Sequence, residues 1–218
     1  MLYTRGRRCL VVGGGEVARR KVEDALGAGL AVVVVSPEVV PALRRLAARG
    51  QITWEERRFR PADVRGMLLV FAAATPEVNE RVFRAARRAG VLVNVVDHPE
   101  MSDFISPAVL KRGPVTVAVS TGGASPALAA RLRDRVASVV GEEAGEWAAL
   151  LARFRRRVQE VVSDPRVRQE ILRRAAGLDG EAAIARGEMS DLEELLESWL
   201  APYRAASPSR EGEVAGGG

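Results

Sequence analysis

The feature that most constrains the fold is an alternation of short apolar runs with helical patterns between residues 8 and 96. The helical stretches carry apolar residues three and four positions apart, whereas the strands are almost continuously apolar. Strands of this kind, separated by helices, are typical of a parallel sheet covered on both faces. The sequence therefore predicts a doubly wound α/β domain with strands over 8–12, 31–35, 52–55, 68–73 and 91–96, and helices over 17–28, 39–49 and 77–89.

A glycine-rich loop lies between the first predicted strand and the first predicted helix. The stretch VVGGGEVA matches the pattern G-x-G-x-x-A, with Gly13, Gly15 and Ala18 at the small-residue positions. In a dinucleotide-binding unit the first glycine permits a tight turn, and the second lets the backbone approach a pyrophosphate. The third small residue lets the helix pack closely on its strand, while N–H groups at the helix start face the anion. We therefore predict a Rossmann-type dinucleotide site, with a glycine turn that binds no ligand as the alternative.

The end of the second predicted strand bears on the choice of cofactor. An acid that binds ribose is expected there, about 20 residues beyond the loop, but the strand is followed by Ser36, Pro37 and Glu38. Ser36 is placed to bond the ribose, and Glu38 is within reach from the next turn. No arginine directly follows the strand to receive a 2′-phosphate. We therefore predict NAD rather than NADP.

Two further strand ends should border the other half of the crevice, because ligands bind at the carboxyl ends of parallel strands. The fourth predicted strand leads to Thr75, and the fifth leads through Asn94 to Asp97 and His98. Asp97 is the only carboxylate at that fifth end, which makes it a candidate for proton transfer; capping the next loop is the alternative. His98 is the sole histidine, so neither a metal cluster nor a catalytic triad is predicted.

The pattern changes after residue 96. Residues 97–114 are predicted to be loop-rich and residues 115–120 to form one more strand. A turn at Gly122 and Gly123 then precedes a helix that Ser125 caps.

Beyond residue 142 the pattern is helical, with breaks near 163–165, 177–180 and 187–190. The composition of the last dozen residues is that of a disordered tail. We predict four parts along the chain: a dinucleotide-binding domain over 1–110, a small segment over 111–141, a helical domain over 142–205, and the tail over 206–218.

Composition excludes several classes of protein. Hydrophobic residues make up 47% of the 218-residue chain and charged residues 28%, which excludes wholesale disorder. No apolar run approaches the roughly 20 residues that cross a bilayer, and no signal sequence stands at the start, so we expect a cytoplasmic protein without membrane contact. The single cysteine, Cys9, excludes an internal disulfide, and we expect it to be a buried apolar residue.

Arginine dominates the positive charge. The chain has a net charge of +5, and of its 33 basic residues only Lys21 and Lys111 are lysines. The guanidinium group presents a planar fork to carboxylates and phosphates. A solvated helix surface explains this bias, and so does a partner with several negative charges, such as nucleic acid, an acidic small molecule or a phosphorylated cofactor. Charge alone does not choose among them.

Six stretches of sequence resemble, in order and spacing, the N-terminal family of siroheme synthases. They are VVGGGEVARRK, VSPE, AAATPEVNERV, NVVDHPE, FISPAVL and VAVSTGGASPALAARLR. The likeness covers about residues 7–140, and residues 142–205 resemble the family's short helical region less distinctively. Members of this family are precorrin-2 dehydrogenases, and some are also sirohydrochlorin ferrochelatases.

The resemblance implies NAD-dependent oxidation of precorrin-2 to sirohydrochlorin in siroheme biosynthesis. It also implies a Rossmann domain, a central segment over 111–141 that builds a homodimer, and a small helical domain. By motif, the family's functional positions fall on this sequence as follows: NAD contacts on Glu16, Val17, Pro37 and Glu38, the key aspartate on Asp97, and a serine near the tetrapyrrole pocket on Ser125.

The substrate that the resemblance implies is a polycarboxylate, which gives an arginine-rich surface an electrostatic purpose. The turn at Gly122 and Gly123, together with the helix start at Ser125, is a candidate carboxylate seat; a plain helix cap is the alternative. We count Asn94 with these as a substrate-binding candidate. Iron insertion is left open, because Asp97 would assist deprotonation whereas no histidine or cysteine cluster holds iron.

Two other functions fit the Rossmann half equally well. One is a non-catalytic NAD-sensing module whose basic helices bind a protein or nucleic acid. Nucleic acid is disfavoured, because the helices after residue 140 mix arginine with acids and offer few aromatic rings for stacking. The other is a dehydrogenase of a different acidic metabolite. A sensor should tolerate Asp97→Asn, whereas a dehydrogenase should lose turnover.

The sequence departs from the family in two ways. It begins only a few residues before the first predicted strand, where family members carry a longer lead-in, so the start is expected to be trimmed or to lack a packing segment. It also has no room for the methyltransferase of the large fused siroheme synthases. We therefore do not expect this chain to make precorrin-2 itself.

Overall fold

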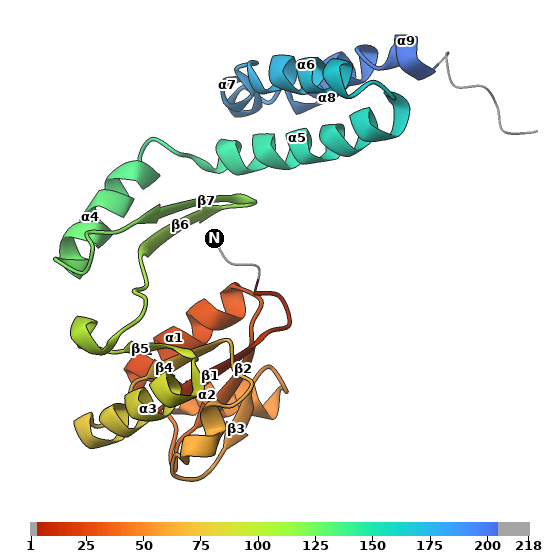
Figure 1. The fold of residues 1–218 in the computed structure, drawn as a ribbon. Coiled ribbons are helices and arrows are strands. Elements are labelled where there is room, and N and C mark those ends of the chain that lie inside the picture. The colour runs from red at the N-terminus through yellow and green to blue at the C-terminus, as the bar shows by residue number, and fades with distance from the viewer. Residues whose placement is uncertain (1–3, 205–218) are drawn as a thin grey trace, which may run out of the picture. The chain divides into compact units, whose positions relative to one another are not determined.

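The computed structural model describes residues 4–204 (Figure 1). The chain divides between Ser106 and Pro107 into two compact units, which are described separately below. The boundary expected after residue 110 lies inside strand β6 (Ala108–Arg112), whose partner β7 (Val115–Val119) belongs to the second unit. Because the two strands pair, the structure places the division before β6.

The first unit is a five-stranded parallel sheet in the order β3-β2-β1-β4-β5. Its strands are β1 (Arg8–Val12), β2 (Ala31–Val35), β3 (Thr53–Glu55), β4 (Leu69–Ala72) and β5 (Leu92–Val95). Helices α1 (Glu16–Gly27), α2 (Pro41–Ala48) and α3 (Pro76–Ala89) connect them, with 3₁₀ turns at Pro61–Val64 and Pro99–Met101. The predicted doubly wound α/β fold is confirmed, and the element ends shift by only one or two residues.

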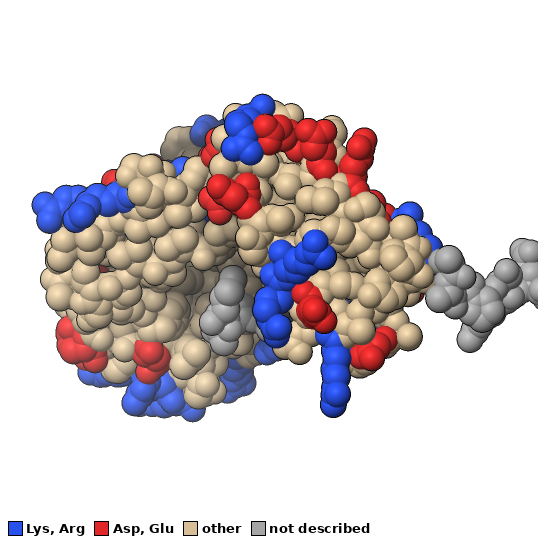
Figure 2. Space-filling model, turned by 90° about the horizontal axis from the view of Figure 1, so that it is seen from above, with Lys and Arg blue, Asp and Glu red and all other residues tan. Residues whose placement is uncertain are grey.

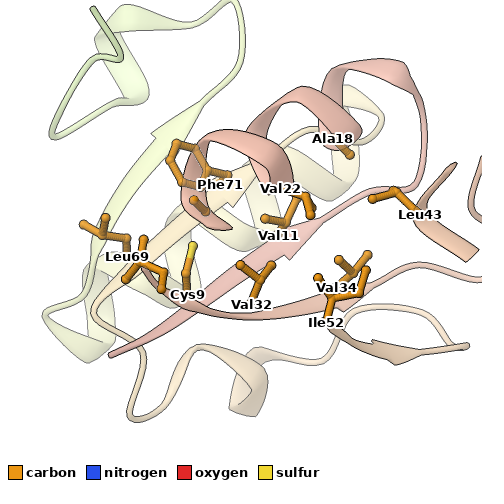
Figure 3. Close-up of a cluster of buried hydrophobic side chains, with 12 residues drawn as sticks. Cys9, Val11, Ala18, Val22, Val32, Val34, Leu43, Ile52, Leu69 and Phe71 are labelled. Atoms are coloured by element: carbon orange, nitrogen blue, oxygen red, sulfur yellow. The ribbon is translucent and has the colours of Figure 1, made fainter. Parts of the chain in front are cut away.

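Apolar side chains cover both faces of this sheet, because successive residues of a strand point to opposite sides. On one face Cys9 and Val11 of β1 pack against Val22 of α1 and Leu43 of α2 (Figure 3). On the other face the alternate residues of β1 pack against α3. Cys9 is fully buried, as predicted, and this burial raises the pKa of its thiol to about 12.

The second unit begins with the β6–β7 hairpin and helix α4 (Pro126–Ala137). The prediction that 97–114 is loop-rich was wrong at its end, where β6 lies. Pro107 and the Gly113-Pro114 turn flank the strand, and residues of these types are typical of loops. The strand conformation itself depends on pairing with β7. Gly113 has a φ of 50° at the first position of the two-residue hairpin turn, where glycine is favoured.

The rest of the second unit is helical, as predicted. It comprises α5 (Glu142–Val161), α6 (Pro165–Ala176), α7 (Gly180–Ala185), α8 (Met189–Ser198) and α9 (Ala201–Arg204). Trp147 and Phe154 of α5 and Leu196 of α8 belong to its buried core. The predicted tail over 206–218 lies outside the described residues. Within residues 4–204 no helix is long and apolar enough to cross a membrane.

Charged groups of both signs lie on the face shown in Figure 2, separated by uncharged surface. Several arginines of the second unit have acidic neighbours, as in the pair between Arg153 and Glu193 at 2.6 Å. Ion pairs of this exposed kind contribute little to stability. They show that part of the arginine content forms a solvated, charge-compensated surface.

Candidate functional site

The first glycine of the loop after β1 occupies a position that only glycine tolerates. Gly13 has a φ of 125°, and a Cβ atom there would lie 2.1 Å from the carbonyl oxygen of Ala73. Its N–H donates a hydrogen bond of 3.1 Å to the carbonyl of Val35 at the end of β2. The tight turn predicted at Gly13 is therefore present, and it brings the ends of three strands together.

The middle glycine, Gly14, is equally constrained, although the G-x-G pattern leaves its position open. A Cβ atom on Gly14 would lie 1.8 Å from the carbonyl oxygen of Glu38 and 2.8 Å from the Ser36 hydroxyl. The Gly14 carbonyl accepts a hydrogen bond of 2.8 Å from the N–H of Val40. Gly14 thus packs the loop after β2 directly against the glycine loop, a role that sequence reasoning missed.

The third glycine faces open space. No atom lies within 4 Å of the position that a Cβ on Gly15 would take. Gly15 is also the N-cap of α1, and no side chain caps the helix there. The first N–H groups of α1 therefore lack a side-chain acceptor, which suits an anion next to the backbone.

A cavity of about 670 Å³ opens beside this loop, of a size that small molecules and cofactors occupy. It lies at the carboxyl ends of three neighbouring strands, since Val12 of β1 pairs in register with Val35 of β2 and Ala72 of β4. Six of the predicted cofactor-binding residues line it: Gly13, Gly15, Ser36, Pro37, Glu38 and Thr75.

The other three predicted cofactor residues do not line the cavity. Ala18 is fully buried in the core between α1 and the sheet, which is the close helix packing predicted for it. Glu16 is exposed and pairs with Arg19 at 2.6 Å. Val17 is partly buried in the first turn of α1. Direct cofactor contacts of Glu16 and Val17 stay predictions.

The loop after β2 divides its work between two residues. The Ser36 hydroxyl donates to the carbonyl of Glu38 at 2.6 Å, and the indole N–H of Trp54 donates to the Ser36 carbonyl at 3.0 Å. Ser36 is buried and its hydroxyl hydrogen shapes the loop, so only its lone pairs are left for a ligand. Glu38 is exposed and presents the acid at this edge of the cavity.

Some residues that line the cavity were not predicted from the sequence, among them two arginines and a phenylalanine. Arg58 and Phe59 come from the segment after β3, and Arg81 comes from α3. Arg58 and Arg81 lie more than 20 residues after the end of β2 in the sequence, so no pattern beside that strand indicates them. Two arginines thus line the cavity, although none directly follows β2.

Asp97 follows β5 in an unusual conformation. Its φ is 62°, and among the described residues no other non-glycine residue has a positive φ. Aspartate is one of the few residue types that tolerate this left-handed region. Asp97 is exposed, and its carboxylate accepts no hydrogen bond from the described part of the chain. The structure therefore gives no support to the loop-capping alternative.

Asn94 and His98 have local partners. Asn94 is buried on β5, and its amide donates a hydrogen bond of 2.8 Å to the carbonyl of Phe104. The ring of His98 lies 2.8 Å from Glu100 in the next 3₁₀ turn. Substrate contact by Asn94 stays a prediction. Between residues 4 and 204 no group of three or more His, Cys, Asp or Glu residues is arranged to hold a metal ion.

The remaining predicted substrate residues belong to the second unit. Ser125 caps α4, as predicted, by accepting a hydrogen bond of 3.2 Å from the N–H of Leu128. Gly122 and Gly123 have φ values of 63° and 89° and form the turn before this cap. The plain N-cap role of Ser125 is thus present, and the carboxylate seat stays a prediction.

Comparison with known proteins places these features in a family. Residues 1–108 match the family model described as "Putative NAD(P)-binding". Residues 112–138 match the sirohaem biosynthesis protein central region, and residues 143–200 match the sirohaem synthase dimerisation region.

Curated relatives give the same picture. A siroheme synthase of Methylococcus capsulatus is 43% identical over 95% of this chain and 44% of its own length. Siroheme synthase 3 of Aeromonas hydrophila is 40% identical over 88% of this chain and 42% of its own length. The chain thus spans less than half the length of these relatives.

A solved structure covers almost the whole fold. The structure titled "SirC, precorrin-2 dehydrogenase" is 25% identical, with a TM-score of 0.77 over 91% of this chain and 98% of that chain. Together with the three consecutive family models, this likeness shows that the chain belongs to the sirohaem biosynthesis family that those models describe.

Proposed function

We propose that this protein oxidises precorrin-2 to sirohydrochlorin with NAD as the hydride acceptor. The observation that carries the proposal is the cavity at the carboxyl ends of β1, β2 and β4, which opens beside Gly15 and the uncapped start of α1. The choice of precorrin-2 as substrate rests on the family, and a solved structure titled as a precorrin-2 dehydrogenase shares the fold.

The residues around the cavity fit a dinucleotide. The backbone at Gly15 and the start of α1 would hold the pyrophosphate. Pro37 and Glu38 would border the adenosine ribose, and Ala74 and Thr75 after β4 would border the nicotinamide half. When bound, NAD supplies the acceptor for a hydride.

Asp97 is proposed to take the accompanying proton. Loss of a hydride and a proton extends the conjugation of the macrocycle, so a base near the reacting carbon is useful. Asp97 offers an exposed carboxylate in a left-handed backbone conformation that is uncommon for residues other than glycine. The proton leaves to solvent after each turnover.

The second unit is proposed to build a homodimer and to contribute Gly122, Gly123 and Ser125 to substrate binding. A two-stranded hairpin is marginally stable by itself, and α4 buries only Ala129. Apolar side chains stay exposed on this unit, and Val139 is 77% exposed. These features support pairing with a second copy.

An anaerobic assay tests the proposal. Purified protein is mixed with enzymatically made precorrin-2 and NAD, and both NADH and the visible spectrum of sirohydrochlorin are followed. Asp97→Asn should still bind NAD but lose turnover by a factor of about 100 or more. Parallel reactions with NADP and with Fe²⁺ test the cofactor preference and the iron insertion that the sequence leaves open.

Two outcomes would overturn the proposal. A folded wild-type protein that binds NAD but releases no NADH would exclude precorrin-2 as its substrate and favour the NAD-sensing alternative. Unchanged turnover in Asp97→Asn would exclude Asp97 as the proton acceptor.

A further inference from the structure

Lys21 lies where three elements of the first unit meet. It belongs to α1, and its Nζ atom is 3.1 Å from the hydroxyl of Ser106. The same ammonium group lies 5.6 Å from the centre of the Phe71 ring on β4. The carboxylate of Asp97, after β5, is close enough to raise the pKa of Lys21.

The ammonium group of Lys21 is partly buried without a close counter-ion. Burial lowers the pKa of Lys21, while the carboxylates of Asp24 and Asp97 act in the opposite direction and Arg20 adds to the lowering. Within residues 4–204, no carboxylate comes within ion-pair distance, and the hydrogen-bond partner is the neutral Ser106 hydroxyl. A partly buried charge in this state is costly unless an anion completes its surroundings.

The surroundings of Lys21 are held in place by the segment that returns along β5. The N–H of Asp103 donates to the carbonyl of Val93 at 2.8 Å, and the Asp103 carboxylate accepts from the N–H of Val93 at 3.0 Å. The ring of Phe104 then packs edge-on against Phe71, with ring centres 5.4 Å apart. These contacts hold the Phe71 ring and place the segment that leads to Ser106 along β5.

Arg19, another cation on α1, already has acidic partners. Arg19 pairs with Glu16 at 2.6 Å and with Glu23 at 2.5 Å on the exposed side of the helix. The ammonium group of Lys21 has three donors, and Ser106 accepts from one of them. Lys21 therefore keeps donors for an anion, whereas Arg19 is already neutralised.

We propose that Lys21 binds one carboxylate of the polycarboxylate substrate. This inference rests on the proposed function and names a contact within that same site. A carboxylate beside Lys21 would accept the free N–H donors and supply the missing counter-charge. Lys21 is then a substrate-binding residue that needs no direct contact with the cofactor.

Lys21→Met tests this, because methionine keeps an unbranched chain of similar length and removes the charge. The KM for precorrin-2 should rise roughly tenfold or more, while kcat changes little and the Kd for NAD stays the same. Lys21→Arg should recover part of the lost affinity. Arg20→Met, an exposed position on the same helix, is the matched control and should behave as wild type.

A binding experiment without turnover separates this inference from the proposed function. Sirohydrochlorin, which keeps the carboxylates, is titrated into each variant without NAD, at low and high salt. Weaker binding by Lys21→Met than by Arg20→Met, with a smaller salt dependence than wild type, supports the contact even if no variant turns over. Equal KM and equal sirohydrochlorin affinity in Lys21→Met and wild type would overturn it.

The same comparison detects a merely structural role. Lys21→Met and Lys21→Gln are compared with wild type for melting temperature and for affinity toward NAD and sirohydrochlorin. If both variants melt well below wild type and lose both affinities together, Lys21 has a structural role and the proposed contact is contradicted. Lys21→Gln that melts with wild type and loses only tetrapyrrole affinity would support it.

Discussion

A Cβ atom on Gly14 would lie 1.8 Å from the carbonyl oxygen of Glu38, whereas one on Gly15 would meet nothing within 4 Å. Two adjacent glycines of one loop therefore serve different purposes. Gly14 lets the loop after β2 pack against the glycine loop, and Gly15 keeps the backbone open toward the cavity. Alanine at each position should separate folding from cofactor binding.

Gly14→Ala is expected to destabilise the first unit. The added methyl group forces the Ser36–Glu38 loop to move, and overpacking of this kind costs about 1–3 kcal/mol. The free energy of unfolding, measured by urea denaturation, should fall by that amount, and NAD affinity should fall with it. A variant as stable as wild type would show that the loop after β2 yields without cost.

Gly15→Ala should fold normally but bind NAD poorly. The backbone of Gly15 has ordinary extended angles, with φ of −83° and ψ of −173°, so alanine costs less than about 1 kcal/mol there. Its methyl group would occupy the space that the pyrophosphate needs, and the Kd for NAD should rise roughly tenfold or more. Calorimetric titration measures this, and an unchanged Kd would place the pyrophosphate elsewhere.

The positive φ of Asp97 allows stability and turnover to be separated. Asn tolerates the left-handed region as Asp does, whereas alanine pays about 1–2 kcal/mol there. Asp97→Asn should therefore unfold with wild type, and Asp97→Ala should unfold at lower urea concentration. Both variants should lose turnover. Turnover in either variant would contradict the role of Asp97 as proton acceptor. Equal stability of the two variants would contradict the backbone strain expected for alanine at this position.

Local patterns predicted most of the fold. Apolar periodicity was enough to predict the sheet of the first unit and the helices after residue 142. The side chains that these elements bury recur at the spacing of a strand or a helix, so the pattern is visible in each segment by itself. Strand β6 was missed because its conformation depends on pairing with β7, which lies beyond the Gly113-Pro114 turn.

The candidate site was predicted in part, for the same physical reason. The roles of Gly13 and Ser125 follow from neighbouring residues, and both are present in the structure. The packing of Gly14 on Glu38 and the arrival of Arg58 and Arg81 at the cavity depend on contacts between distant segments. No local pattern reports such contacts.

Gly180 provides a test of how independently the two units fold. A Cβ atom there would lie 2.2 Å from the Trp147 ring, so Gly180→Ala should disrupt the packing of α7 on α5. Thermal unfolding should begin at lower temperature, and tryptophan fluorescence should report it. NAD affinity should be retained, because the cavity residues all belong to the first unit. Loss of NAD binding would show that the first unit depends on the second.

Cys9 predicts a pH dependence of stability. Burial raises the pKa of its thiol to about 12, whereas the unfolded chain ionises near the ordinary value of 9.0. The folded state thus retains a proton that the unfolded state loses, so this contribution is complete below about pH 9 and is lost as pH rises toward about 12. Cys9→Ala removes the titrating group, and its unfolding free energy should therefore approach that of wild type as the pH is raised from about 8 to about 10. Urea denaturation of both proteins measures this difference, which can change by at most about 1.4 kcal/mol per pH unit. Two parallel curves would show that Cys9 ionises equally in both states.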